Sequence, residues 1–301
     1  MRRAAFAALA CALAAIACVE GSAATFTASA TNAASFTTAA DWVAPVVTLV
    51  SPADGALTND GTPDLSGAAG NAAGDSSTVT VRIYAGSSAT GSPVQTLTPT
   101  RSGASWSTTA ATLTSGTYTA QASQSDTGAN TGTSTAHTFT VDTIAPTATD
   151  VAASNGGATA GKIEAGDLVT FTFSEPIDPA SVLAGWNGTS TAVQVKITAG
   201  VLAPDPFTVL DSGGSATVHL GTVQSNGDYV TTTATFDATM VRSADMKSVV
   251  VTVGTRQSGI MAVLAAGAQN MAWTVDGAVK DLAGNAVTTV SLTESASDVD
   301  F

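Results

Sequence analysis

The chain has 301 residues, a formal net charge of −13 at pH 7 and only 11% charged residues. With so few basic side chains it lacks the positive surface that phosphate backbones require, so no nucleic-acid partner is expected. Both cysteines, Cys11 and Cys18, lie near the N-terminus. If that segment is removed, disulfides and thiolate metal sites are excluded.

Residues 1–24 have the pattern of a secretory signal peptide. Met1–Arg3 is positively charged, Ala4–Val19 is apolar, and small residues end at Ala23 and Ala24, where we expect cleavage. A lipoprotein anchor at Cys18 is the weaker alternative, because the large aliphatic residue of that cleavage motif is missing. No later apolar run could span a membrane, so the mature chain has no expected transmembrane segment. We therefore expect a secreted, extracellular or cell-surface protein.

Residues 25–44 form a Thr/Ala-rich N-terminal segment with two aromatic residues, Phe26 and Phe36. Each phenylalanine could begin a short strand or dock on the module that follows. The segment resembles the stretch after the signal peptide in secreted, fibre-forming bacterial matrix proteins. That resemblance implies a subunit that assembles through an N-terminal strand.

Two Ala-Pro pairs, at Pro45 and Pro146, each precede a region rich in Thr and Val. Between them, short alternating runs recur at the spacing of an immunoglobulin-like sandwich of about 100 residues. We predict a first domain over residues 45–143. Its expected strands are 46–50, 79–84, 94–98, 105–108, 118–122 and 137–141.

The same pattern continues in a larger second module, predicted over residues 144–301. Its expected strands are 168–173, 193–197, 216–220, 229–236, 249–253, 271–275 and 287–292. Extra hairpins or long loops are expected in 199–215 and 222–247, and 260–268 could be a helical turn or a buried strand. The predicted fold class is all-β, with two tandem immunoglobulin-like β-sandwiches, the second enlarged.

The first module resembles the bacterial Ig-like (Big-type) repeats of large adhesins and biofilm-associated surface proteins, over residues 45–142. The resemblance rests on Val47–Gly67 (VTLVSPADGALTNDGTPDLSG), Ser102–Gly132 with its Gly-x-x-Trp-Ser and Gly-Thr-Tyr-Thr runs, and the exit His137–Pro146. The turn at Asp126 departs from the family's Asp-x-x-Gly-Asn pattern before Asn130. The resemblance implies adhesion or biofilm structure.

The second module, residues 146–301, resembles Ig-like domains associated with S-layer proteins. Its marks are Phe171–Val182 (FTFSEPIDPASV) and Val279–Val287 (VKDLAGNAV). The long middle of the module matches no motif.

No catalytic constellation is visible, so we expect no enzyme. The two histidines, His137 and His219, lie inside alternating runs, and no nucleophile elbow, zinc helix motif or phosphate loop is present. Glu175 and Asp178 stand too close along the chain to flank a sugar bond, and we interpret them as caps of a proline-fixed turn.

Calcium is the cofactor that the acidic loops could hold, because hard cations take several oxygen ligands. The alternative is that these side chains form Asx turns with their own backbone. Similar adhesin repeats often hold calcium where modules meet. The candidate ligands are Asp54, Asp60, Asp64, Asp126, Asn130 and Asp142.

We predict different roles for two of the tryptophans. Trp106 lies on a predicted strand and should pack in the core. Trp186 lies between turn-forming residues, where it could contact a ligand such as a sugar or fold back as a lid on its own sandwich.

Together these patterns predict a non-enzymatic structural or adhesive protein of the bacterial surface. The partner would be a cell-surface or extracellular-matrix protein or a glycan, with self-association as a further alternative. One rival is a carbohydrate-binding protein that uses Trp186. The other is a self-assembling extracellular matrix or fibre subunit whose N-terminal strand joins a neighbour's sheet.

Overall fold

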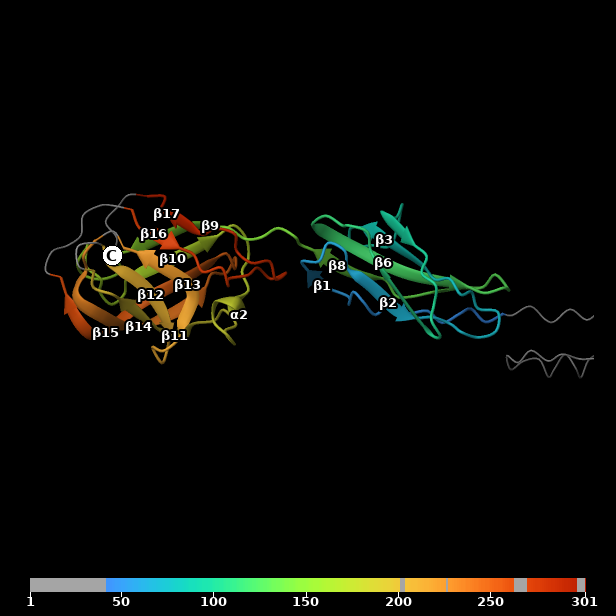
Figure 1. The fold of residues 1–301 in the computed structure, drawn as a ribbon, viewed down its shortest axis with the longest axis horizontal. Coiled ribbons are helices and arrows are strands. Elements are labelled where there is room, and N and C mark those ends of the chain that lie inside the picture. The colour runs from blue at the N-terminus through green and yellow to red at the C-terminus, as the bar shows by residue number, and fades with distance from the viewer. Residues whose placement is uncertain (1–41, 201–203, 226, 263–269, 297–300) are drawn as a thin grey trace, which may run out of the picture. The chain divides into compact units, whose positions relative to one another are not determined.

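The computed structural model describes residues 42–200, 204–225, 227–262, 270–296 and 301. The predicted signal peptide, residues 25–41 of the N-terminal segment and most of 260–268 therefore lie outside the described residues. The chain divides into two compact units (Figure 1). Unit 1 contains the residues up to Ala56 and Asp60–Val141; unit 2 contains Leu57–Asn59 and Asp142–Phe301. Strands dominate both units, which confirms the predicted all-β fold class.

Unit 1 consists of a larger and a smaller sheet. The larger sheet has six strands in the order β1-β8-β6-β3-β4, with β7 pairing to β6, and the smaller sheet pairs β2 with β5. Their bounds are β1 Ala56–Thr58, β2 Asp64–Ala68, β3 Thr80–Ala85, β4 Gln95–Leu97, β5 Ser105–Thr109, β6 Gly116–Ser125, β7 Thr131–Thr133 and β8 His137–Val141.

The core of unit 1 is formed by alternate side chains of these strands. Val81 and Ile83 of β3 are fully buried, as is Leu65 of β2. Trp106 of β5 is 3% exposed, which confirms its predicted core role. Its indole N–H lies 3.1 Å from the carbonyl of Thr48 and 3.0 Å from that of Ala68, so burial leaves no unpaired donor.

The predicted strand 46–50 lies beside β2 although it is not itself a regular strand. The N–H groups of Thr48 and Val50 donate to the carbonyls of Ala68 and Ser66. Val47 and Leu49 on this segment are buried whereas Val46 and Val50 are exposed, the alternation of a strand with one face on the core.

Unit 2 is built from one nine-stranded antiparallel sheet in the order β17-β16-β13-β12-β11-β14-β15-β10-β9. Strands β17 and β9 also contact each other, so the sheet curls round until its two ends meet. The bounds are β9 Ala148–Ser154, β10 Leu168–Phe173, β11 Thr191–Ile197, β12 Pro206–Asp211, β13 Thr217–Gln224, β14 Val230–Arg242, β15 Ser248–Met261, β16 Ala272–Thr274 and β17 Ser291–Thr293.

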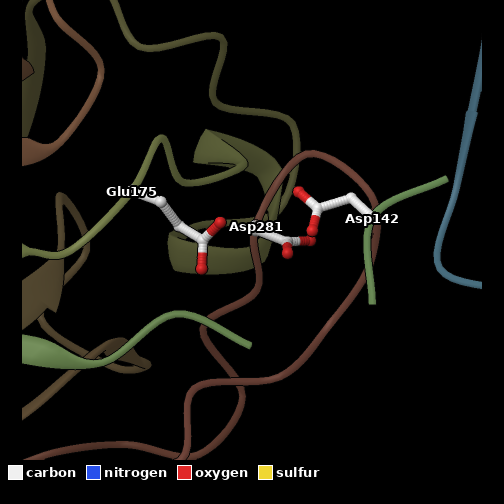
Figure 2. A group of neighbouring side chains, drawn as sticks. All are labelled: Asp142, Glu175 and Asp281. Atoms are coloured by element: carbon white, nitrogen blue, oxygen red, sulfur yellow. The ribbon is translucent and has the colours of Figure 1, made fainter. Parts of the chain in front are cut away.

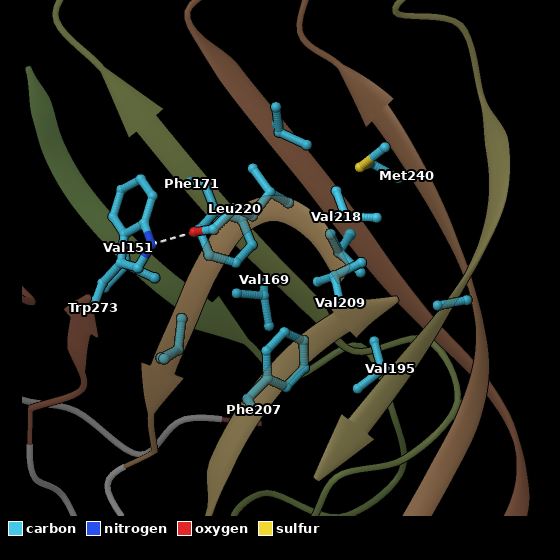
Figure 3. Close-up of a cluster of buried hydrophobic side chains, with 14 of the residues drawn as sticks. Val151, Val169, Phe171, Val195, Phe207, Val209, Val218, Leu220, Met240 and Trp273 are labelled. Atoms are coloured by element: carbon cyan, nitrogen blue, oxygen red, sulfur yellow. Dashed lines mark hydrogen bonds between the residues drawn. The ribbon is translucent and has the colours of Figure 1, made fainter. Parts of the chain in front are cut away.

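The curled sheet encloses one hydrophobic core (Figure 3). Trp273 is fully buried in this core and meets the rings of Phe171 and Phe173 edge-on, at centroid distances of 5.1 and 5.4 Å. Its indole N–H donates to the carbonyl of Leu220. The geometry combines large apolar area with a satisfied polar atom, which makes a well-defined core.

The length that unit 2 adds over a minimal sandwich goes into long strands. Strand β12 lies in the predicted extra stretch 199–215, and the hairpin of β14 and β15 fills much of 222–247 and extends beyond it. The one helix of the described residues, α2 (Pro179–Val182), follows β10 and is capped by Asp178, whose carboxylate accepts the N–H of Ala180. This confirms the predicted capping role of Asp178.

Candidate functional site

Three of the six predicted calcium ligands are exposed and already bonded within unit 1. Asp54 accepts the backbone N–H of Thr138 at 2.8 Å. Asp60 accepts both the N–H and the hydroxyl of Thr62, at 2.8 and 3.0 Å. Asp64 accepts the Thr109 hydroxyl at 2.6 Å. Only Asp60 forms the local turn of the alternative interpretation, whereas Asp54 and Asp64 bond to residues far away in the chain.

Asp126 and Asn130 form a closed turn, here named the first turn (Asp126–Asn130). The Asp126 carboxylate accepts the backbone N–H of Asn130 on Oδ1 and its side-chain amide on Oδ2, both at 2.8 Å. The N–H of Asp126 donates to the Asn130 carbonyl at 3.0 Å. The side-chain bond to Asn130 is the largest factor that lowers the pKa of Asp126. The two residues thus close the turn through their own hydrogen bonds.

Asp142 is the predicted ligand that meets other acids. Its carboxylate lies with those of Glu175 and Asp281, each offering an oxygen within 4.8 Å of the others (Figure 2). Among the described residues this is the one group of three or more such side chains close enough to share a metal ion. We call it the acidic cluster.

The three acids come from separate parts of unit 2. Asp142 begins the unit, and Glu175 follows β10 in the Ser-Glu-Pro sequence. Asp281 belongs to the turn Asp281–Asn285, named the second turn, where its carboxylate accepts the N–H of Asn285 at 2.8 Å and the side-chain amide at 2.7 Å.

Asn285 also ties Asp142 to the second turn. Its side-chain amide donates to the Asp142 carbonyl at 2.8 Å, in addition to its bond with Asp281. The Asp142 carboxylate itself accepts the N–H of Ile144 at 3.1 Å. Backbone bonds therefore hold two of the three carboxylates in place before any ligand binds, as a preorganised site requires.

Glu175 is the member of the cluster whose charge is least compensated. Its Oε1 atom is buried and has no hydrogen-bond partner in the described structure. Burial raises the pKa of Glu175 above its ordinary value, and the negative charges of Asp142 and Asp281 raise it further, while Lys247 opposes them. The interpretation of Glu175 as a turn cap was therefore wrong, because its carboxylate points at other acids rather than at a backbone N–H.

The oxygen geometry of the acidic cluster suits a hard cation. Calcium binds oxygens at 2.3–2.6 Å, so two ligand oxygens on opposite sides of the ion lie about 5 Å apart. Three carboxylates within that limit could share one ion, which would also neutralise their repulsion. Sequence reasoning missed Glu175 and Asp281, although both lie in the two motifs that mark the second module.

The remaining candidates do not gather at a site. Trp186 is 6% exposed and donates its indole N–H to the Thr189 carbonyl at 2.6 Å, so the structure supports packing rather than ligand contact. His137 lies 2.9 Å from the Pro52 carbonyl, and His219 lies 2.8 Å from Asp276 on the surface of unit 2. Within the described residues neither imidazole is hydrogen-bonded to a serine, threonine or cysteine side chain.

Comparison with known proteins places a family on unit 1. Residues 48–143 match the model of a bacterial Ig-like domain. No curated protein is similar enough in sequence to match the chain. The resemblance of residues 146–301 to S-layer-associated domains is not supported by a family match and stays a prediction.

Two solved structures are similar at low identity. The fibronectin(III)-like modules of CbhA from Clostridium thermocellum are 14% identical, with 70% of this chain and 90% of that chain covered and a TM-score of 0.25. Dimeric latent PorU from Porphyromonas gingivalis is 16% identical, with 71% of this chain covered and a TM-score of 0.24. The match spans only 20% of the PorU chain.

The family match assigns a class rather than an activity. Bacterial Ig-like domains are typical of surface proteins and typically non-catalytic, so the chain carries a surface or structural module. In the described residues no helix is long and apolar enough to cross a membrane.

Proposed function

We propose that this protein is secreted and acts at the bacterial cell surface as a structural or adhesive component, displaying Ig-like modules to a surface protein, matrix protein or glycan. The observation that carries the proposal is the match of residues 48–143 to a bacterial Ig-like domain. The signal-peptide pattern of residues 1–24 supports export. Specificity would lie in exposed loops and edges rather than in a reaction.

Export and display can be tested on intact cells of the producing organism. A chain with an epitope tag after residue 301 should lose the tag when protease is added to unbroken cells, whereas a cytoplasmic marker should survive. Deletion of residues 2–24 should keep the tag protected. Protection of the full-length chain would contradict surface display. Reduced attachment of a deletion strain to its substratum would support the adhesive role.

We further propose that the acidic cluster binds calcium and fixes the start of unit 2. The supporting observation is the buried, unpartnered Oε1 of Glu175 beside two other carboxylates. Binding to the folded state alone stabilises it by about 2.7 kcal/mol when calcium is one hundred times its dissociation constant. Thermal unfolding of residues 25–301 with calcium and with chelator should show this gain in one of two transitions.

A matched pair of variants separates site binding from general charge screening. Glu175→Gln removes a cluster carboxylate and should abolish most of the calcium-dependent shift. Asp237→Asn makes the same charge change at an exposed position of β14 and should leave the shift intact. Equal shifts in both variants, or no shift in the parent chain, would remove the calcium proposal.

A second candidate function is a self-assembling matrix or fibre subunit. It is favoured by an open sheet edge in unit 1, described below. The carbohydrate-binding alternative has lost its main support, because the ring of Trp186 is almost fully buried.

A further inference from the structure

We propose that the outer edge of β5 is the acceptor for an added strand, and that the strand is supplied by residues 25–40 of a second copy of this chain. The inference rests on the self-assembly alternative and names its acceptor. Strands added to a sheet edge gain affinity from main-chain hydrogen bonds, so the first requirement is an edge with unsatisfied backbone groups.

Hydrogen bonding at β5 defines that edge. Ala69 donates to the carbonyl of Ala104, and Ala110 donates to that of Pro63, so alternate residues of β5 face β2. Ser107 and Thr109 therefore direct their N–H and C=O groups away from β2. Both residues are exposed, and no bond from the described residues reaches these four groups.

The β5 edge also lacks the usual protection against pairing. Natural edges carry prolines, charges or bulges, or are covered. Residues 102–125 contain no charged residue and no proline. In contrast, the edge strand β4 is flanked by Pro93 and Pro99, segment 46–51 lies between Pro45 and Pro52, and β17 meets β9 in unit 2.

A hollow of about 450 Å³ adjoins this edge on the outer face of the small sheet. It is lined by uncharged residues, most of which bear a hydroxyl: Val50, Ser66, Gly67, Thr100, Ser102, Ser105, Trp106 and Ser107. Outward side chains of an added strand would lie against this surface. Short hydroxyl-bearing and apolar residues suit it, and acidic ones do not.

Residues 25–40 have the matching chemistry. The segment contains no charge, no proline and no glycine, and it consists of Thr, Ala and Ser with Phe26, Phe36 and one Asn. Fully extended, it reaches about 50 Å at roughly 3.3 Å per residue, far more than β5 needs. Cross-strand pairs of Thr with Ser or Thr stabilise a sheet, and they are what this segment would form with Ser107 and Thr109.

The path of the chain favours a donor strand from a second copy over one from the same copy. The N-terminal segment leads into residues 46–51, which lie on the opposite side of β2 from β5. Pairing within one chain would require the segment to cross over β2. Pairing between copies requires no such crossing. Each copy has one donor strand (residues 25–40) and one acceptor edge (β5), so copies can add to one another head to tail without limit.

The test separates donor from acceptor. Residues 25–301 carrying both Ser107→Lys and Thr109→Lys form a donor without an acceptor edge, and residues 42–301 form an acceptor without a donor. Each should sediment as a monomer, with a cooperative melting transition to confirm folding. Their mixture should give a 1:1 heterodimer, while unmodified residues 25–301 should form longer chains. Because the chain carries a net negative charge, added salt should promote this assembly.

Thr96→Lys together with Thr98→Lys is the matched control, since the pair places the same two positive charges at exposed positions in and just after β4. It should leave assembly intact. Assembly that survives the two β5 lysines but fails without residues 25–41 would overturn this acceptor while keeping the self-assembly function. Assembly that persists without residues 25–41 would overturn the N-terminal donor and with it this proposal, while a chain that stays monomeric at all concentrations would overturn the self-assembly function as well. Surface display is measured separately and is not affected by either result.

Discussion

The first turn of unit 1 and the second turn of unit 2 are the same local structure in different surroundings. In each, an aspartate carboxylate accepts the backbone N–H and the side-chain amide of an asparagine four residues later, at 2.7–2.8 Å. The N–H of the aspartate returns to the asparagine carbonyl at 3.0 Å in both. The Asp and Asn at the two ends of the turn therefore make the same set of hydrogen bonds in both units.

The surroundings decide what each turn can do. Asp126 is partly exposed, whereas Asp281 is 3% exposed and lies beside Asp142 and Glu175. Asn285 uses its amide a second time to hold the carbonyl of Asp142. A turn that only closes a loop in unit 1 thus becomes, in unit 2, part of a cluster of three acids.

The largest expected effect distinguishes the two aspartates. In chelator, Asp281→Ala should destabilise unit 2 by about 2–3 kcal/mol, because it removes a carboxylate that is 3% exposed and leaves three donors, on Gly284 and Asn285, without their acceptor. Asp126→Ala should cost unit 1 clearly less, since the Asp126 side chain is partly exposed and water can take the place of its carboxylate. Denaturant unfolding that follows each unit separately checks this. Equal losses would mean that burial does not distinguish the turns.

Exchanging alanine and glycine at the fourth position of each turn tests how much backbone strain that position carries. Ala129 has a φ of 66° and Gly284 a φ of 100°, a region that disfavours residues with a Cβ. Gly284→Ala should therefore destabilise unit 2 by about 1–2 kcal/mol. Ala129→Gly should stabilise unit 1 by about 0.5 kcal/mol, because relief of strain exceeds the added freedom of the unfolded chain. A loss of stability in Ala129→Gly would contradict this account.

The smallest effect is an opposite dependence of the two units on pH. The pKa of Glu175 in the folded state is raised above its ordinary value of 4.5. At pH values just above 4.5 and without calcium, the folded state therefore binds a proton at Glu175 that the unfolded state has already lost. The unfolding free energy of unit 2 should then fall as pH rises through that window. Glu175→Gln should remove this component, which a stability difference between variant and parent across pH 4 to 7 would show.

For unit 1 the sign is reversed. The bond with Asn130 lowers the pKa of Asp126, so the ionised carboxylate stabilises the fold above the ordinary range of aspartate. This stabilisation should be lost as pH falls through the lowered pKa. Comparison of the parent chain with Asp126→Asn between pH 2 and 5 measures it. A stability difference independent of pH would contradict it.

Much of the fold could be predicted because apolar and polar residues alternate along many of the strands. Val79, Val81 and Ile83 mark β3, and Leu168–Phe173 marks β10, since every second residue is buried. Strands β1, β2, β7, β9 and β12 were not predicted individually, because short or small-residue strands alternate weakly. The closure of the nine-stranded sheet also has no local pattern, since β9 and β17 are far apart in the chain.

The candidate site was only partly predictable for a related reason. Asp142 was proposed as a calcium ligand, but so were five residues that bond within their own loops or to a neighbouring strand. Nothing in the sequence spacing relates Asp142 to Glu175 or Asp281.

By itself, then, the sequence determined the all-β class, the Asp-to-Asn turns and the absence of charge in residues 25–40 and 102–125. These depend on local propensity and composition, which need no partner in space. Tertiary structure alone decided which carboxylates meet, that Trp186 is buried, and that β5 is left with an open edge. Those features depend on residues far apart in the chain, whose proximity only the packed sheets establish.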